Sequence, residues 1–283
     1  MTAYPRIIAH RCGGVLAMEN SLAGLDAAVR LGCQAVEFDV MLTADRVPIL
    51  MHDETLDRTT RCTGRVDEQT LAQIRACDPD VPTLAEAMAF CRTHAVWTNI
   101  ELKPAAGHET ETGSVVGQWL ATHWNGNGVI SSFSQKSALA GRHELADAPF
   151  ALLCDTLPMD WEAQLAQLNA VAVHLDAARV AAGDAARLRD AGIPWAAWTV
   201  NDRATADRLF GLGAAGIFTD PEIASVGLRE KEAEVKGITV AVGRFPYAAS
   251  GKAIRPAPTA SSSAGPSHAS SARNTTASTS SPR

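Results

Sequence analysis

Two histidines and three carboxylates stand at or near the ends of short apolar segments of this chain. The histidines are His10 and His52, and the acids are Glu37, Asp39 and Glu101. An imidazole titrates near neutral pH and can move protons, whereas carboxylate oxygens are the donors that hard divalent cations prefer. Together these residue types predict proton-transfer chemistry beside a bound metal ion.

Two cations adjoin this set. Arg11 directly follows His10, and Lys103 lies two residues after Glu101. Both side chains can hold an anion through charge-assisted hydrogen bonds, although either one alone is equally well explained as a surface cation. With the histidines and the metal, they predict a site that binds and cleaves a phosphate ester.

The spacing of the acids supports the metal. Glu37 and Asp39 are two residues apart on an expected strand, so both side chains point to one face. Buried together they would raise each other's pKa and cost several kcal/mol each. A divalent cation removes that cost, and Glu101 on the next parallel strand supplies a third oxygen. The donor set favours Mg²⁺ or Ca²⁺ over Zn²⁺.

An ion-pair network is the alternative explanation of the three acids. Their partners would then be Arg11, Lys103 or Arg58. For any single acid this reading is the better one, but three acids together with two histidines at strand ends favour the metal site.

Eight short apolar segments alternate with amphipathic stretches, as in a parallel sheet that is buried on both faces. The expected strands are 6–9, 35–41, 97–102, 128–132, 150–154, 170–175, 194–199 and 215–218, and helical patterns cover 21–31, 109–122, 177–191 and 204–212. Eight such units predict an α/β fold, the (β/α)8 TIM barrel, whose active site lies in the loops that follow the strands.

A ninth apolar segment, 47–51, follows the second strand too closely for a parallel crossover, so we expect an antiparallel hairpin. A turn centred on Asp45 and Arg46 would place residue 39 opposite residue 52, and thus His52 beside Asp39. An insertion at about 54–96, with helical patterns at 68–76 and 84–92, is expected to cap the active-site face. Residues 1–236 are expected to form the barrel, and 237–283 a disordered tail rich in Ala, Ser, Thr and Pro.

Bulk properties exclude several classes of protein. The net charge of −6 over 283 residues argues against a sequence-independent nucleic-acid binder. No apolar run approaches the roughly 20 residues that span a bilayer, and residues 1–6 lack the apolar core of a signal peptide. The six cysteines form no CxxC pair, so we expect reduced, buried thiols and a cytoplasmic protein with no membrane span.

Three further residues end strands. Trp198 and Phe133 are positioned to pack on a small alcohol at the barrel mouth, or else to fill the top of the core. His174 is a candidate for the rim of the site.

The motifs AHRxGG, EN, EFDV, HD, LDRTT, NIELKP, SSF, WTVN and TD, in this order over residues 6 to about 221, resemble the glycerophosphodiester phosphodiesterases. The resemblance is greatest to the short cytosolic bacterial members. It implies a barrel enzyme that hydrolyses small glycerophosphodiesters, such as glycerophosphocholine or glycerophosphoethanolamine, to an alcohol and sn-glycerol 3-phosphate with Mg²⁺ or Ca²⁺.

The resemblance also implies roles for individual residues. General acid and base would be His10 and His52, and the metal ligands Glu37, Asp39 and Glu101. Arg11 and Lys103 would bind the phosphate, and Trp198 and Phe133 would contact the glycerol. Glu19 and Asp53 would orient the residues that touch the substrate. Which histidine is the acid, whether water or a neighbouring substrate hydroxyl attacks, and the oligomeric state stay open.

Two positions depart from the family pattern, Cys12 in place of glycine and Met18 in place of proline. A residue with a Cβ disfavours positive φ, so the first loop is expected to shift unless Gly13 and Gly14 absorb the change.

Two alternative functions stay open. One is a phosphodiesterase that acts on lysophospholipids, which a long apolar groove would favour, and the other is a phosphate-ester binding protein without turnover.

Overall fold

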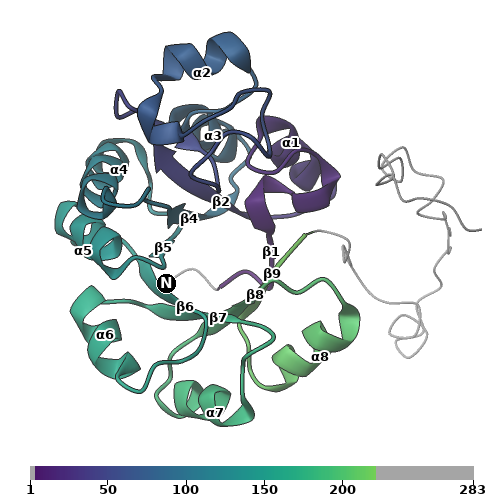
Figure 1. Cartoon of the computed structure of the whole chain (residues 1–283). Coiled ribbons are helices and arrows are strands. Elements are labelled where there is room, and N and C mark those ends of the chain that lie inside the picture. The colour runs from purple at the N-terminus through teal and green to yellow at the C-terminus, as the bar shows by residue number, and fades with distance from the viewer. Residues whose placement is uncertain (1–3, 221–283) are drawn as a thin grey trace, which may run out of the picture. The chain divides into compact units, whose positions relative to one another are not determined.

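Eight parallel strands close into a barrel in the computed structural model, which describes residues 4–220 (Figure 1). The barrel strands are β1 (Ile7–Ala9), β2 (Ala35–Leu42), β4 (Trp97–Leu102), β5 (Gly128–Ser132), β6 (Phe150–Cys154), β7 (Ala172–Asp176), β8 (Trp195–Trp198) and β9 (Gly216–Thr219). The pairing of β1 with both β9 and β2 closes the ring. The expected TIM barrel is therefore confirmed, and the tail expected at 237–283 lies outside the described residues.

Seven helices of the described chain follow barrel strands and surround the ring. They are α1 (Leu22–Arg30), α3 (Leu84–Thr93), α4 (Glu109–His123), α5 (Gln135–Glu144), α6 (Trp161–Leu168), α7 (Ala182–Asp190) and α8 (Arg203–Gly211). The largest apolar cluster lies between these helices and the outer faces of the strands. Burial of this layer on both sides explains why the strands read as near-continuous apolar runs.

The lower part of the barrel interior is filled by a second set of side chains. Four alanines that point inward leave room for the rings of Tyr4, Trp97 and Phe218. Tyr4 comes from the segment before β1 and packs edge-on against Trp97, with ring centroids 5.2 Å apart. The polar part of the interior is therefore confined to the upper, carboxyl end of the strands.

The ninth strand, β3 (Pro48–Leu50), pairs antiparallel with β2 as expected, but in a different register. Asp39 lies opposite Met51 rather than His52, because the Met51 amide donates to the Asp39 carbonyl at 3.1 Å. The turn is a three-residue loop in which Arg46 adopts a left-handed conformation, φ 61°. This loop is one residue longer than the expected two-residue turn at Asp45 and Arg46, and His52 falls just beyond the paired segment.

The segment after β3 forms a separate small core beside the barrel. It contains the one-turn helix η3 (Val66–Glu68) and α2 (Leu71–Cys77), which lies outside the ring of helices (Figure 1). Its apolar residues, including Leu56, Ile74 and Val81, pack on β3 and the end of β2. In contrast, the buried face of α3 belongs to the main barrel core, although α3 lies within the expected insertion.

Two expectations from bulk composition were also tested. All six cysteines are unpaired, but only Cys12, Cys62 and Cys91 are buried, and Cys77 is exposed at the end of α2. Among residues 4–220, no helix is both long enough and apolar enough to cross a membrane.

Candidate active site

A cavity of about 120 Å³ opens at the carboxyl ends of the barrel strands. It collects residues that are far apart in the sequence, and its lining includes His10, Arg11, Glu37, Asp39, His52, Glu101, Lys103, Phe133, His174 and Trp198. The two histidines, the three acids and the two cations singled out from the sequence therefore meet at one small volume.

The three carboxylates are held together by the register of β2 and β4. Asp39 pairs directly with Glu101, and Glu37 lies one inward-facing position below Asp39. Each of the three offers an oxygen within 4.8 Å of the others, and all three side chains are buried. The Glu37 Oε1 atom is buried and has no hydrogen-bond partner among the described residues. An unpaired buried carboxylate oxygen beside two others is the arrangement that a hard divalent cation fits.

The electrostatics of the three acids are uneven. Burial, and next the charge of Asp39, raise the pKa of Glu37 well above its usual value and that of Glu101 to about 7. The pKa of Asp39 is instead lowered, because Lys103, His52 and Asn20 stabilise its charged form against the cost of burial. Asp39 is therefore the carboxylate that most readily keeps its charge without a metal.

Two cations balance part of this charge. The Lys103 Nζ lies 3.0 Å from Glu101 and 3.4 Å from Asp39, and the Arg11 Nε lies 3.9 Å from Asp39. Ion pairing is thus present, as the alternative reading expected, but among residues 4–220 no Arg or Lys side chain forms an ion pair with Glu37. Arg58, the third suggested partner, contacts none of the three acids in the described chain.

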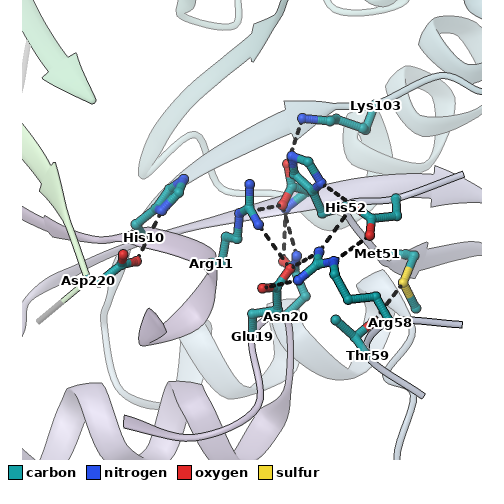
Figure 2. A network of polar contacts seen from close by, with 12 residues as sticks. His10, Arg11, Glu19, Asn20, Met51, His52, Arg58, Thr59, Lys103 and Asp220 are labelled. Carbon is teal, nitrogen blue, oxygen red and sulfur yellow. Dashed lines mark hydrogen bonds and ion pairs between the residues drawn. The ribbon is translucent and has the colours of Figure 1, made fainter. Parts of the chain in front are cut away.

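His10 directly follows β1 and is held by a carboxylate from the far end of the barrel sequence. Its Nδ1 lies 3.2 Å from Asp220 (Figure 2), and its Nε2 lies 3.8 Å from Glu37. Asn201 donates a hydrogen bond to Asp220 at 2.9 Å. Gly14, with φ +50°, allows this close approach, because a Cβ there would lie 2.6 Å from the Asp220 Oδ1. The Nδ1 contact leaves Nε2 as the nitrogen on the cavity side.

His52 is held in the same way by its neighbour. Its Nδ1 lies 2.6 Å from Asp53, and burial lowers the pKa of His52 although Asp39 and Asp53 oppose that shift. Arg58 then joins Asp53 to Glu19, donating to both Glu19 oxygens at 2.7 and 2.8 Å. Figure 2 shows this chain of contacts between the His52 loop and the first loop.

Glu19 completes the chain of contacts on the first loop, because it accepts a hydrogen bond from Arg11 at 3.1 Å. Its pKa is lowered, since Arg58 and Arg11 outweigh the cost of its burial. Arg11, Glu19, Arg58, Asp53 and His52 therefore form a continuous ionic network, called here the Arg58 network.

The first loop is also fixed by Asn20, whose side chain donates to Asp39 at 2.8 Å and accepts from the Asp39 amide at 3.0 Å. Cys12 adopts a left-handed conformation, φ 70°, despite its Cβ, and its side chain is buried. The loop therefore keeps the conformation that a glycine would favour, and the Arg11 amide donates to Glu37 at 2.8 Å.

The aromatic residues lie at the mouth of the cavity. Phe133 is 48% exposed and meets Trp198 edge-to-face, with centroids 5.4 Å apart. Phe133 therefore does not fill the top of the core. His174 does not lie at the rim as expected: it is 1% exposed and forms the floor of the cavity, where its Nε2 contacts the Tyr4 hydroxyl. His174 lies this deep because it is two residues before the end of β7. Burial lowers the pKa of His174 to about 3.

Sequence reasoning missed Asp220 and Asn20, and it suggested Arg58 as a partner of the three clustered acids rather than of Glu19 and Asp53. Asp220, Asn20 and Arg58 each contact a residue that the sequence singled out. Asp220 follows the last strand and Asn20 follows Glu19, so both lie within motifs, but their partners are 210 and 19 residues away in the sequence. Position at a strand end was the available signal for Asp220.

Comparison with known proteins places this architecture in a family. Residues 10–222 match the model of the glycerophosphoryl diester phosphodiesterase family, which is about three quarters of the chain. The chain belongs to this family. A second family model, the dimerisation domain of pyridine nucleotide-disulphide oxidoreductases, matches 214–261, most of which lies outside the described residues.

Individual relatives of this phosphodiesterase-family chain match different shares of its length. It is 31% identical over 231 residues to YhdW of Bacillus subtilis, named provisionally as a glycerophosphodiester phosphodiesterase, covering 76% of this chain and 93% of YhdW. Human glycerophosphodiester phosphodiesterase 1 is 37% identical over 139 residues, which cover 44% of this chain and 42% of the human protein.

Solved structures agree with the fold. An Oleispira antarctica phosphodiesterase in complex with the product sn-glycerol-3-phosphate is 29% identical, with a TM-score of 0.73 and coverage of 76% of this chain and 93% of that chain. A Silicibacter pomeroyi structure, 23% identical with a TM-score of 0.69, covers 84% of this chain and 96% of its own and supports the fold alone.

Proposed function

We propose that this member of the family hydrolyses glycerophosphodiesters to an alcohol and sn-glycerol 3-phosphate, with Mg²⁺ or Ca²⁺ as cofactor. The observation that carries the proposal is that two histidines, each held at Nδ1 by a carboxylate, line the same cavity as three clustered acids. The product named for the Oleispira antarctica relative supports the glycerol phosphate part of the substrate.

The metal would be held by Glu37, Asp39 and Glu101, and when bound it supplies positive charge to the phosphate oxygens. Arg11 and Lys103 bind the same phosphate, because both cations face the cavity beside the acids. These contacts hold the phosphorus in place while the two histidines move protons at their Nε2 atoms. Asp220 and Asp53 fix the tautomer and orientation of His10 and His52.

Glu19 and Asp53 orient Arg11 and His52, respectively, because each contacts one of these residues and both are joined through Arg58. Trp198 and Phe133 pack on the glycerol carbons at the mouth of the cavity, since their faces and edges are the apolar surface there. The preserved first loop supports turnover over binding alone: Cys12 leaves Arg11 and His10 lining the cavity.

We further propose that the enzyme works in the cytoplasm on a small-molecule substrate. The support is its cysteine usage, because six cysteines without a disulfide are typical of a reducing compartment.

The test measures sn-glycerol 3-phosphate released from glycerophosphoethanolamine by the purified full chain. We expect activity with Mg²⁺ or Ca²⁺, its loss with chelator, and a drop of about a hundredfold or more in kcat for His10→Ala and for His52→Ala. The matched control is His143→Ala, because His143 lies on α5 with its side chain 87% exposed. Near wild-type turnover in both cavity variants would refute the assignment, as would unchanged metal affinity in Glu37→Gln.

A further inference from the structure

A second, larger pocket adjoins the catalytic cavity. It has a volume of about 630 Å³, about five times that of the cavity itself, and lies within the usual size range of ligand pockets. His52 lines both spaces, so its ring stands at their boundary. We call this space the outer pocket.

The walls of the outer pocket come from the first loop with α1 on one side and from the segment around α2 on the other. They include Met18, Leu22, Pro79, Val81 and Pro82. Met18 is 56% exposed and Leu22 is 37% exposed, and both are among the few large apolar side chains exposed in the described chain. Exposed apolar side chains gathered at a concave surface mark a binding site for an apolar group.

The charged residues of the outer pocket are already paired within the protein. Arg58 binds Glu19 at 2.7 Å, and Arg61 lies 3.0 Å from Asp80 and 3.4 Å from Asp78. The remaining pair joins Arg75 to Glu86. An ionic group on a ligand would therefore have to compete with existing ion pairs.

The outer pocket also lacks an aromatic cage. None of the described residues that line it is Phe, Tyr or Trp. Quaternary ammonium groups such as choline are recognised on aromatic faces, so this composition does not favour choline. The aromatic pair of Phe133 and Trp198 lines only the catalytic cavity.

We infer that the outer pocket receives the leaving alcohol, and that the preferred substrates are glycerophosphodiesters whose alcohol carries an apolar chain. This inference rests on the proposed function. The glycerol lies on the side of Trp198, and the ester bond to the alcohol lies beside His52. When the phosphorus–oxygen bond to the alcohol breaks, that oxygen keeps the electron pair and takes the proton from His52 Nε2. The attacking oxygen, which belongs to water or to the neighbouring substrate hydroxyl, forms the new phosphorus–oxygen bond and gives its proton to His10. Where the substrate hydroxyl attacks, water then hydrolyses the cyclic phosphate to glycerol 3-phosphate.

The test compares kcat/KM for the ethyl, butyl and octyl esters of glycerol 3-phosphate and for glycerophosphocholine. Six further methylene groups, partly buried, should raise kcat/KM at least about tenfold from the ethyl to the octyl ester. In Leu22→Asp and in Met18→Asp, the octyl-to-ethyl ratio should fall by a similar factor. Asp is compatible with the fold at Leu22, which is the first residue of α1 and is partly exposed.

The matched control is Met159→Asp, a methionine that is 89% exposed and lines neither space. Its octyl-to-ethyl ratio should equal that of the wild type. A flat dependence on chain length, a preference for glycerophosphocholine over the octyl ester, or an unchanged ratio in both aspartate variants would each overturn the inference. Release of glycerol 3-phosphate from the ethyl ester tests the proposed function separately, so the two failures are distinguishable.

Discussion

Substitution of Arg58 by methionine tests whether the Arg58 network positions the catalytic residues. Arg58 donates two hydrogen bonds to Glu19 and two to Asp53, and its side chain is 46% exposed. Because solvent weakens each contact, we take about 0.5 kcal/mol for each bond, the low end of the usual range. If all of this is expressed in the transition state, kcat falls roughly thirtyfold, the equivalent of about 2 kcal/mol.

The assay is the initial rate of sn-glycerol 3-phosphate release from glycerophosphoethanolamine at saturating metal. We expect kcat to fall in Arg58→Met while KM changes little, since Arg58 acts through Glu19 and Asp53. Millimolar guanidinium should restore part of the rate, and Arg58→Lys should be intermediate, because an ammonium cannot bridge both acids in the same way.

The matched control is Arg65→Met. Arg65 is also an arginine of the insertion that bridges acids, Glu54 and Asp67, but it lines neither the catalytic cavity nor the outer pocket. Its kcat should stay within about twofold of wild type. Equal losses in the two variants, or an unchanged kcat in Arg58→Met, would show that the network has no positioning role.

Three further results are expected. In Asp53→Asn, the limb of the pH–rate profile that belongs to His52 should move to lower pH, because the carboxylate that raises the pKa of His52 is gone; an upward shift would contradict this. Gly14→Ala should cost about 1–2 kcal/mol in urea unfolding and also lower kcat, since its φ is +50° and its new Cβ would displace Asp220 from His10; wild-type stability with wild-type kcat would speak against it. A thiol reagent should label Cys77 first in the native protein, and mass mapping that finds Cys12 labelled first would argue that the first loop opens.

The barrel and most of the catalytic cavity were predictable because both depend on short-range patterns. The period-two spacing of Glu37 and Asp39 placed them on one face of β2, and the alternation of strands and helices required Glu101 to end a neighbouring strand. The predicted register of β3 was wrong by one residue. The amino-acid composition of this turn does not distinguish a two-residue turn from the observed three-residue loop, in which Arg46 is left-handed.

Partners across the barrel were harder to predict. Asp220 meets His10 only because β9 lies next to β1, and a strand-end aspartate carries no mark of which histidine it will contact. His174 carried the same signal as the catalytic histidines, but its depth depends on where the interior is filled by Tyr4 and Trp97. Arg58 pairs with Glu19 across 39 residues, and the loop between them sets that contact.

The small core formed by β3 and α2 has a consequence for how such an enzyme can diverge. His52, Asp53 and one wall of the outer pocket belong to this segment, whereas the acids that fit a metal are on strands that close the ring. Exchange of this segment between relatives would therefore alter the choice of alcohol together with one proton-transfer group, and leave the cation-holding half of the machinery intact. Diversification of substrates on this scaffold is thus expected to proceed by replacing one excursion of the chain.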